Sequence, residues 1–264
     1  MTAALVLGVL QGVFEWLPVS SEGVVSASYS FFFDKSFDEA VQFALWLHIG
    51  TVPSVLVVFR RDCVGIVKEV AGLRVGPGGG PSPFLTFLIV ATLVSAPIGL
   101  GLLIGLEELS TRVGASAMAV VGALMLVTGY TQLRSNGTGE RGRGDLSVLD
   151  GVFAGIGQGL AVLPGLSRSG TTVAVLLARR IDRREALGLS FLMSVPASLG
   201  ASLWAGLSDG FAWSAEALIS AAIAFVVGLV AIRAFMVVAD RVNLGGFIIF
   251  FGLVVFVGGL WQAI

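Results

Sequence analysis

The chain has 264 residues, of which 56% are hydrophobic and only 12% are charged, and its mean hydropathy is +0.95. Soluble domains carry about 25% charged residues, so this composition excludes an ordinary soluble domain and indicates a polytopic α-helical membrane protein. The net charge of −1, without a basic tail, gives no reason to expect a nucleic-acid partner.

The first apolar region covers residues 3–33 and is interrupted by LPVSSEG at 17–23. Each arm is shorter than the roughly 20 residues that a spanning helix needs, so we expect a re-entrant helical hairpin. Non-helical backbone at membrane depth is tolerated only beside protein or a water-filled cavity. The interruption therefore predicts a cavity.

The rest of the chain contains continuous apolar segments and a second interrupted one. Residues 148–178 are interrupted by LPGLSRSG at 163–170 and predict a second re-entrant hairpin. The continuous segments are long enough to cross a bilayer. They predict six spanning helices, at 40–59, 84–106, 114–133, 185–207, 215–235 and 243–263.

The two halves of the chain resemble each other. GVLQGVFEWLPVSSEG (8–23) and GIGQGLAVLPGLSRSG (155–170) share Gln-Gly, Leu-Pro and an ending rich in serine and glycine. Three crossings in each half would invert the second copy, and inverted repeats place the working site near the bilayer midplane. We expect an all-α fold with a single membrane domain over 1–264, in which repeat one covers about 1–133 and repeat two about 148–264.

The distribution of basic residues predicts the orientation, because cytoplasmic loops are enriched in Lys and Arg. The predicted topology places four basic segments on one side, at 60–74, 134–143, 179–184 and 233–241. We therefore expect a multi-pass protein of the cell membrane, with residues 134–147 and 179–184 in the cytoplasm and residues 34–39 and 208–214 outside. The first hairpin would then enter from outside and the second from the cytoplasm.

Four ionisable residues lie inside the predicted membrane segments: Glu15, Glu22, His48 and Arg168. A charge at the bilayer centre costs about 2.5–3.5 kcal/mol, so such residues are usually functional and face partners. The alternatives are a structural ion pair that holds the hairpins together and, for His48, a structural hydrogen bond.

The segment SRSGTT has the features of a phosphate site. Ser167 and Ser169 flank Arg168 in the sequence. Gly170 and Thr172 follow at the start of the next short helix. A helix start offers free backbone N–H groups, and a guanidinium offers a planar fork that suits phosphate oxygens. The two serines could instead serve as N-caps.

The first interruption supplies the complementary groups. Gln11 and Glu15 lie four residues apart, so a helix places them on one face. Ser20 and Ser21 follow in the break. A carboxylate beside hydroxyls and opposite an arginine is what phosphoryl transfer needs. Carboxylates facing phosphate also favour a divalent cation, commonly Mg²⁺, with Glu15 and Glu22 as ligands.

At these residues, EWLPVSSEG and PGLSRSGTT, the chain resembles the undecaprenyl-diphosphate phosphatase (bacitracin-resistance) family. The resemblance extends over essentially the whole chain, and PGLSRSGTT is its most specific motif. It implies hydrolysis of a polyprenyl diphosphate to the monophosphate, which recycles the lipid carrier of cell-envelope glycan synthesis. It also implies a site open to the outer face and a divalent cation, with Mg²⁺ expected and Ca²⁺ or Mn²⁺ as alternatives.

The resemblance carries residue roles to this chain by position. Glu15 matches the second Glu of the family's E-x-x-x-E, and would act as general base or metal ligand. The paired serines are Ser20 and Ser21; Ser21 would be the nucleophile or a phosphate ligand, with direct attack by water slightly favoured. The phosphate-binding loop is matched by Ser167, Arg168, Ser169 and Thr172.

Two positions depart from the family pattern. Gln11 stands where the family has its first Glu, and Val24 stands where a His usually follows the SSxG glycine. Gln11 is still expected to contact substrate. Glu22 and His48 are the candidates to compensate for the lost carboxylate and imidazole.

The expected partners are the polyprenyl diphosphate and the bilayer, and a homodimer is compatible with the sequence. A non-enzymatic transporter or flippase for a polyprenyl phosphate is the alternative, because it would use the same anion site without cleavage.

Overall fold

The computed structural model describes residues 1–72, 79–113, 117–134, 139–163, 165–207, 213–238 and 245–263. The predicted loop at 208–214 and Pro164 of the second interruption therefore lie wholly or partly outside the described residues. Where the chain is described, the fold is all-helical, as predicted. Its helices are α1 (Thr2–Phe14), α2 (Ser21–Phe33), α3 (Phe37–Val58), α4 (Arg60–Val70), α5 (Pro83–Val113), α6 (Ala117–Arg134), α7 (Val148–Leu160), α8 (Arg168–Ala178), α9 (Arg183–Leu207), α10 (Ala215–Val238) and α11 (Gly245–Ala263).

Within the described ranges, four helices are long and apolar enough to cross a membrane, namely α3, α5, α9 and α10. The protein is therefore a multi-pass membrane protein. The other two predicted spans, 114–133 and 243–263, also coincide with helices, α6 and α11. Their apolar stretches, Ala119–Tyr130 and Ile248–Trp261, are shorter than the other four.

Both interrupted regions form pairs of short helices, which we call the first hairpin (α1 and α2) and the second hairpin (α7 and α8). Ser20 caps the start of α2 by accepting a hydrogen bond from the N–H of Gly23. Ser167 caps the start of α8 in the same way, with the N–H of Gly170 as donor. The same chemistry therefore restarts the helix after each break.

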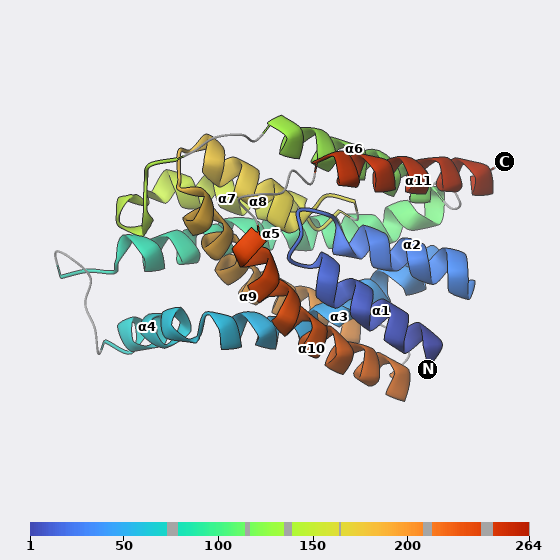
Figure 1. Cartoon of the computed structure of the whole chain (residues 1–264), viewed down its shortest axis with the longest axis horizontal. Helices are drawn as coiled ribbons and strands as arrows, with labels where there is room; N and C mark the ends of the chain where they lie inside the picture. Colours follow the sequence, from blue (N-terminus) through green and yellow to red (C-terminus); the bar gives the residue numbers. More distant parts are fainter. Residues whose placement is uncertain are drawn as a thin grey trace.

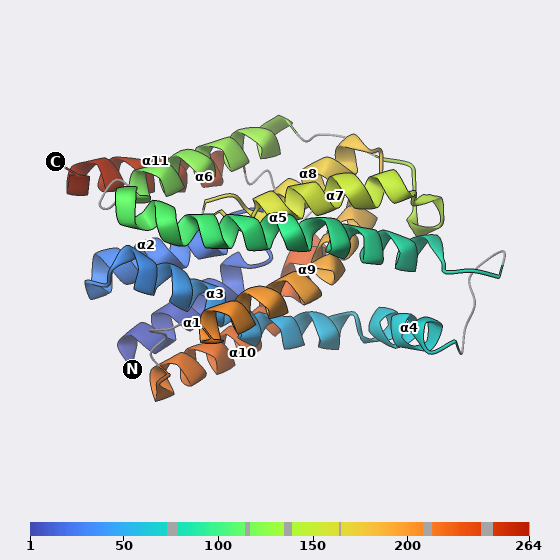
Figure 2. The ribbon, with the colours of Figure 1, turned by 180° about the vertical axis from the view of Figure 1, so that it is seen from behind.

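The molecule is elongated, and α5 runs along most of its length (Figures 1 and 2). The first hairpin lies toward the end that holds both termini, and the second lies toward the opposite end (Figure 1). The turns of the two hairpins approach each other in the middle of the molecule. Residues from the two breaks can therefore meet at mid-length.

Related contacts recur in the two halves. Helix α1 packs on α10 as α7 packs on α5, and α3 packs on α10 as α9 packs on α5. Glycines allow the short helices to approach closely. A Cβ atom added at Gly12 would lie 2.8 Å from Val227 Cβ, and one added at Gly155 would lie 2.9 Å from Val94 Cβ.

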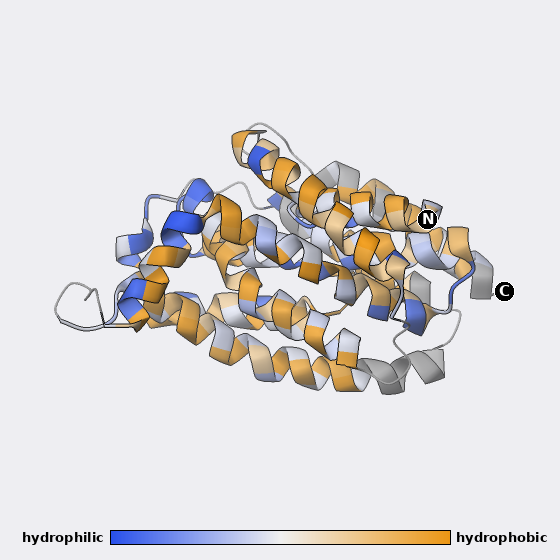
Figure 3. Cartoon of the chain, turned by 90° about the horizontal axis from the view of Figure 1, so that it is seen from below, coloured by the Kyte–Doolittle hydropathy of each residue, from blue (hydrophilic) through white to orange (hydrophobic). Residues whose placement is uncertain are grey.

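Hydrophilic residues gather at the end of the molecule opposite the N-terminus (Figure 3). At that end the fully buried carboxylate of Asp150, in the first turn of α7, accepts hydrogen bonds from Arg141 at 2.6 Å and Arg179 at 2.7 Å. Although burial favours the neutral acid, these hydrogen bonds hold the pKa of Asp150 well below its usual range. The network ties both arms of the second hairpin to the preceding loop.

Candidate active site

The two hairpin turns are bonded to each other. Ser20 Oγ accepts a hydrogen bond from the N–H of Gly165 at 2.9 Å, and Ser169 Oγ donates one to the carbonyl of Leu17 at 2.7 Å. Gly165 has φ +104°, a conformation that favours glycine. Each break therefore supports the other, and their residues form one site.

Glu15 lies at the centre of this site and is 4% exposed. Its Oε1 accepts a hydrogen bond from the guanidinium of Arg168. Its Oε2 accepts hydrogen bonds from Ser21 Oγ at 2.8 Å and from Gln11 Nε2 at 2.9 Å. The carboxylate thus connects the cation of one break with the hydroxyl of the other.

His48 of α3 faces both carboxylates of the first hairpin. Its Nε2 lies 3.3 Å from Glu15 Oε2 and 3.4 Å from Glu22 Oε1. Its Nδ1 lies 3.1 Å from the carbonyl of Leu45, which can only accept, so Nδ1 carries a hydrogen. Because Nε2 also faces only acceptors, either the imidazole is doubly protonated or one of the carboxyls holds the proton.

Helix α9 orients the arginine. Arg168 donates a second hydrogen bond, at 3.3 Å, to the backbone carbonyl of Ser190. The hydroxyls of Ser190 and Thr172 lie 2.6 Å apart, and the Thr172 hydroxyl also donates to the Arg168 carbonyl at 2.7 Å. The sequence did not point to Ser190, because a lone serine in an apolar span has no distinguishing pattern.

Helix α6 also supports the second break. The N–H of Ser167 donates to Thr128 Oγ1 at 3.2 Å, and that hydroxyl donates to the carbonyl of Gly165 at 3.2 Å. The sequence did not point to Thr128 either, because a lone threonine in an apolar helix has no distinguishing pattern. Ser167 Oγ itself accepts from the N–H of Gly170 and lies 3.3 Å from Ser169 Oγ.

These side chains enclose a small cavity of about 10 Å³. A space of this size holds about one water molecule, so a diphosphate can enter only after the turns separate. The cavity is lined by Glu15, Val19, Ser20, Ser21, Glu22, His48, Leu166, Ser167, Arg168 and Ser169.

Most of the predicted site residues therefore lie together. Gln11 lies behind Glu15 and orients it. Gly170 and Thr172 are bonded within the start of α8 and hold that helix instead of lining the cavity. Val24 is buried and also lies outside the lining.

The donor set can be compared with the needs of a divalent cation. In the part of the chain that is described, no group of three or more His, Cys, Asp or Glu residues forms a metal site. Mg²⁺ usually takes only one or two carboxylates together with water and substrate phosphate oxygens. Glu15 and Glu22 both line the cavity and supply two carboxylates. These oxygen donors fit a cation shared with a diphosphate.

The arrangement has the parts required for phosphoryl transfer. A guanidinium can bind phosphate oxygens, and a hydroxyl is hydrogen-bonded to a carboxylate that can accept its proton. Glu15 and Ser21 are buried where the two breaks meet, and the side chain of Arg168 is 12% exposed there.

Comparison of the whole chain with known proteins identifies a family and several relatives that it resembles. Residues 4–259 match the family described as Bacitracin resistance protein BacA. The chain is 36% identical to the undecaprenyl-diphosphatase of Methanococcoides burtonii over 255 residues, which covers 96% of each chain. It is 35% identical to the undecaprenyl-diphosphatase of Haloarcula marismortui, over 99% of this chain and 98% of that protein. The undecaprenyl-diphosphatase of Syntrophotalea carbinolica is 36% identical, over 99% of this chain and 97% of its own.

Proposed function

The chain belongs to the bacitracin resistance protein BacA family, and we propose that it is a membrane phosphatase that hydrolyses undecaprenyl diphosphate to the monophosphate and inorganic phosphate. The observation that carries this proposal is the contact of Glu15 with both Arg168 and Ser21 at the junction of the two breaks. The product would return to use as the lipid carrier of cell-envelope glycan synthesis. A non-enzymatic transporter is not favoured, because the relatives are named as diphosphatases.

The diphosphate would bind by taking over the guanidinium of Arg168 that Glu15 now occupies. Separation of the turns would break the two hydrogen bonds between hairpins, from the Gly165 N–H to Ser20 and from Ser169 to Leu17. The freed hydroxyls of Ser20 and Ser169 would then contact phosphate oxygens.

The hydrogen bond from Ser21 to Glu15 supports the serine as the nucleophile. The Oγ atom would attack the terminal phosphorus while its proton passes to Glu15. The anhydride P–O bond would break and the monophosphate would leave. Water would then attack the phosphorus of the phosphoserine and the bond from phosphorus to Oγ would break. Glu15 would return its proton to Oγ, which restores the hydroxyl, and the proton lost by the water would leave with the phosphate. In the alternative route water attacks directly, with Glu15 as base.

Glu15 and Glu22 would hold a divalent cation, expected to be Mg²⁺, which when bound would neutralise charge on the phosphate oxygens. His48 contacts both carboxylates and would keep them in place. Arg168 would stabilise the charge that develops on the transferred phosphoryl group.

The arrangement in the bilayer is proposed on two grounds. The recurring contacts of α1 with α10 and α7 with α5 support one membrane domain of two inverted repeats, with six spans and two re-entrant hairpins. The basic residues near α4, α7 and α9 support a cytoplasmic location for the end of the molecule opposite the N-terminus. The site would then open to the outer face of the cell membrane.

The test is phosphate release from undecaprenyl diphosphate by the purified protein, with and without a chelator, compared with Glu15→Gln. We expect metal-dependent release by the wild type and almost none from the variant, because the amide cannot accept the serine proton. Absence of release by the wild type with every divalent ion tried would reject the proposal.

A further inference from the structure

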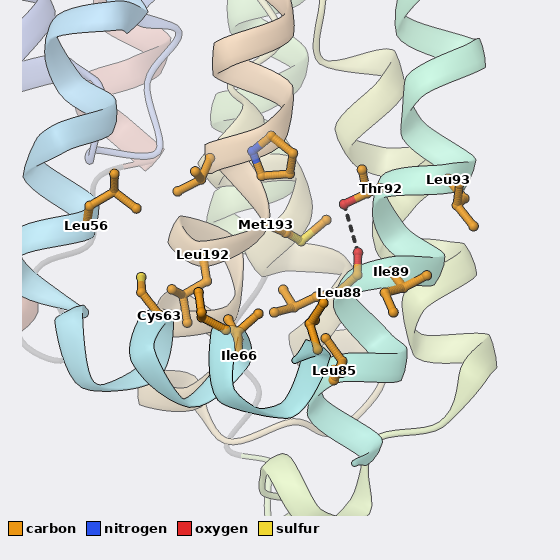
Figure 4. A pocket seen from close by; sticks show the side chains of 14 residues that line it. Leu56, Cys63, Ile66, Leu85, Leu88, Ile89, Thr92, Leu93, Leu192 and Met193 are labelled. Atoms are coloured by element: carbon orange, nitrogen blue, oxygen red, sulfur yellow. Dashed lines mark hydrogen bonds between the residues drawn. The ribbon is translucent and has the colours of Figure 1, made fainter. Parts of the chain in front are cut away.

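A large apolar groove lies between α4, α5 and α9 (Figure 4). Its volume is about 440 Å³, and it is lined by residues such as Ile66 of α4, Leu88 of α5 and Met193 of α9. Sites for small molecules have volumes of roughly 300–1,000 Å³. None of its lining residues belongs to the candidate active site.

The lining suits a hydrocarbon chain. Its one hydroxyl, that of Thr92, already donates to the carbonyl of Leu88 at 2.8 Å (Figure 4). Thr92 and Pro196 also line a second cavity of about 230 Å³ between α5, α7 and α9. The second cavity therefore lies next to the groove along α5, and its lining includes the polar residues Ser95 and Gln158.

Helix α4 lies across one end of the groove, transverse to α5 (Figure 4). Both of its acidic residues are bonded to other parts of the protein. Asp62 forms an ion pair with Arg143 at 2.5 Å, and Glu69 accepts a hydrogen bond from the Ser82 hydroxyl at 2.9 Å. Asp62 is therefore paired with a cation, whereas Glu69 keeps its charge because a serine hydroxyl is neutral. With three basic residues, α4 still carries a surplus of positive charge.

The three basic residues of α4, Arg60, Arg61 and Lys68, are exposed and form no ion pair with any residue that the structure describes. Ile66 and Cys63 of the same helix point into the groove (Figure 4). A helix with apolar residues on one side and free cations elsewhere is typical of the membrane interface, where it attracts anionic lipids.

We propose that this groove binds an anionic glycerophospholipid, with an acyl chain between α5 and α9 and the phosphate against the cations of α4. Charge complementarity selects an anionic headgroup, and the apolar lining selects the chain. A phospholipid is favoured over a polyprenyl phosphate because anionic phospholipids are the bulk source of negative charge in the cytoplasmic leaflet. The proposal rests on the cytoplasmic orientation proposed above for this end of the molecule, and does not depend on the catalytic function.

Cys63 is the only cysteine of the chain and lines the groove, so it reports on occupancy. The delipidated full chain in detergent is treated with N-ethylmaleimide after addition of phosphatidylglycerol, phosphatidylcholine with the same acyl chains, or undecaprenyl monophosphate. We expect phosphatidylglycerol to slow labelling about tenfold relative to phosphatidylcholine. Native mass spectrometry of the same samples counts bound lipid, which separates occupancy from a change in thiol reactivity.

The charge requirement is tested with Arg61→Gln/Lys68→Gln, which should remove the difference between the two phospholipids. The matched control, Arg184→Gln/Arg233→Gln, removes two exposed cations from other helices. It should retain the difference in labelling between the two phospholipids. Equal protection by both phospholipids, or full protection in the α4 variant, would overturn the proposal. Stronger protection and binding with undecaprenyl monophosphate than with phosphatidylglycerol would assign the groove to a prenyl lipid and also overturn it.

Discussion

Buried Glu15 and largely buried Arg168 form an ion pair across the two chain breaks, although 153 residues separate them in the sequence. Removing one partner of a buried pair typically costs about 3–5 kcal/mol, because the other charge is left uncompensated. A diphosphate that binds Arg168 would supply the replacement charge. The pair can therefore hold the two breaks together and still be replaced by substrate.

The arginine should matter through its geometry as well as its charge. Arg168 donates to Glu15 and to the Ser190 carbonyl at once, and a lysine ammonium lacks that planar fork. We expect Arg168→Lys to insert and fold but to lose about 100-fold in kcat/KM, equivalent to about 2.7 kcal/mol. Phosphate release by the purified variant measures this, with Arg184→Lys as control. Wild-type turnover in Arg168→Lys would make the arginine a structural counter-ion only.

Ser21 distinguishes the two chemical routes. If it is the nucleophile, Ser21→Ala should abolish turnover, and acid quenching of the wild type with labelled substrate should trap phosphoserine. Ser30→Ala, in the same helix, serves as control because that hydroxyl bonds only to the Lys35 carbonyl. Substantial turnover in Ser21→Ala, without a trapped adduct in the wild type, would establish direct attack by water.

Much of this site could be predicted because its signals are local. Proline, glycine and serine in LPVSSEG and LPGLSRSG end the apolar helices, and charges at Glu15 and Arg168 are unusual inside a membrane segment. Their supporting contacts could not be predicted. Ser190 and Thr128 reach the site through packing of α9 and α6, and a serine or threonine in an apolar helix can equally well bond its own backbone.

The sequence also did not predict helix α4. Its basic residues marked the segment as a cytoplasmic loop, and its apolar residues form no continuous run. Contacts outside the helix help to hold it in place, because Asp62 pairs with Arg143 and Glu69 accepts a hydrogen bond from Ser82.

The proposed orientation can be tested by labelling in intact cells. In a Cys63→Ser background, a cysteine at Asp38→Cys should react with an impermeant thiol reagent, because 34–39 is expected outside. A cysteine at Arg184→Cys should react only after the cells are opened. Both positions are exposed, so burial does not confound the comparison. Labelling of Arg184→Cys in intact cells would contradict the inverted-repeat arrangement and the outward-facing site.

Asp150 should make thermal stability depend on pH. Its pKa is lowered in the folded protein, because hydrogen bonds from Arg141 and Arg179 outweigh the effect of burial. The stabilisation is therefore fully present above the unfolded value of about 3.9 and is lost as the pH falls below it. We expect Asp150→Asn to destabilise the protein by about 3 kcal/mol at neutral pH, measured as a lower Tm in detergent. The difference in Tm from wild type should shrink below about pH 4; a constant difference across that range would contradict this account.

The last prediction concerns the departures from the family pattern at Gln11 and Val24. They remove one carboxylate and one imidazole from the expected site, while a diphosphate and its cation still need oxygen ligands. Glu22 and His48 line the same cavity as Glu15, and His48 Nε2 contacts both carboxylates.

We therefore expect Glu22→Gln to lower activity, or to raise the cation concentration required, at least about tenfold, equivalent to about 1.4 kcal/mol. His48→Ala should cost less, because the ring holds the carboxylates but supplies no ligand oxygen. Phosphate release is measured across a divalent-ion titration and a pH series, with the exposed Glu140→Gln as control. If Glu22→Gln and His48→Ala both match wild type in rate and metal requirement, compensation is wrong, and Glu15 alone supplies the carboxylate chemistry of the site.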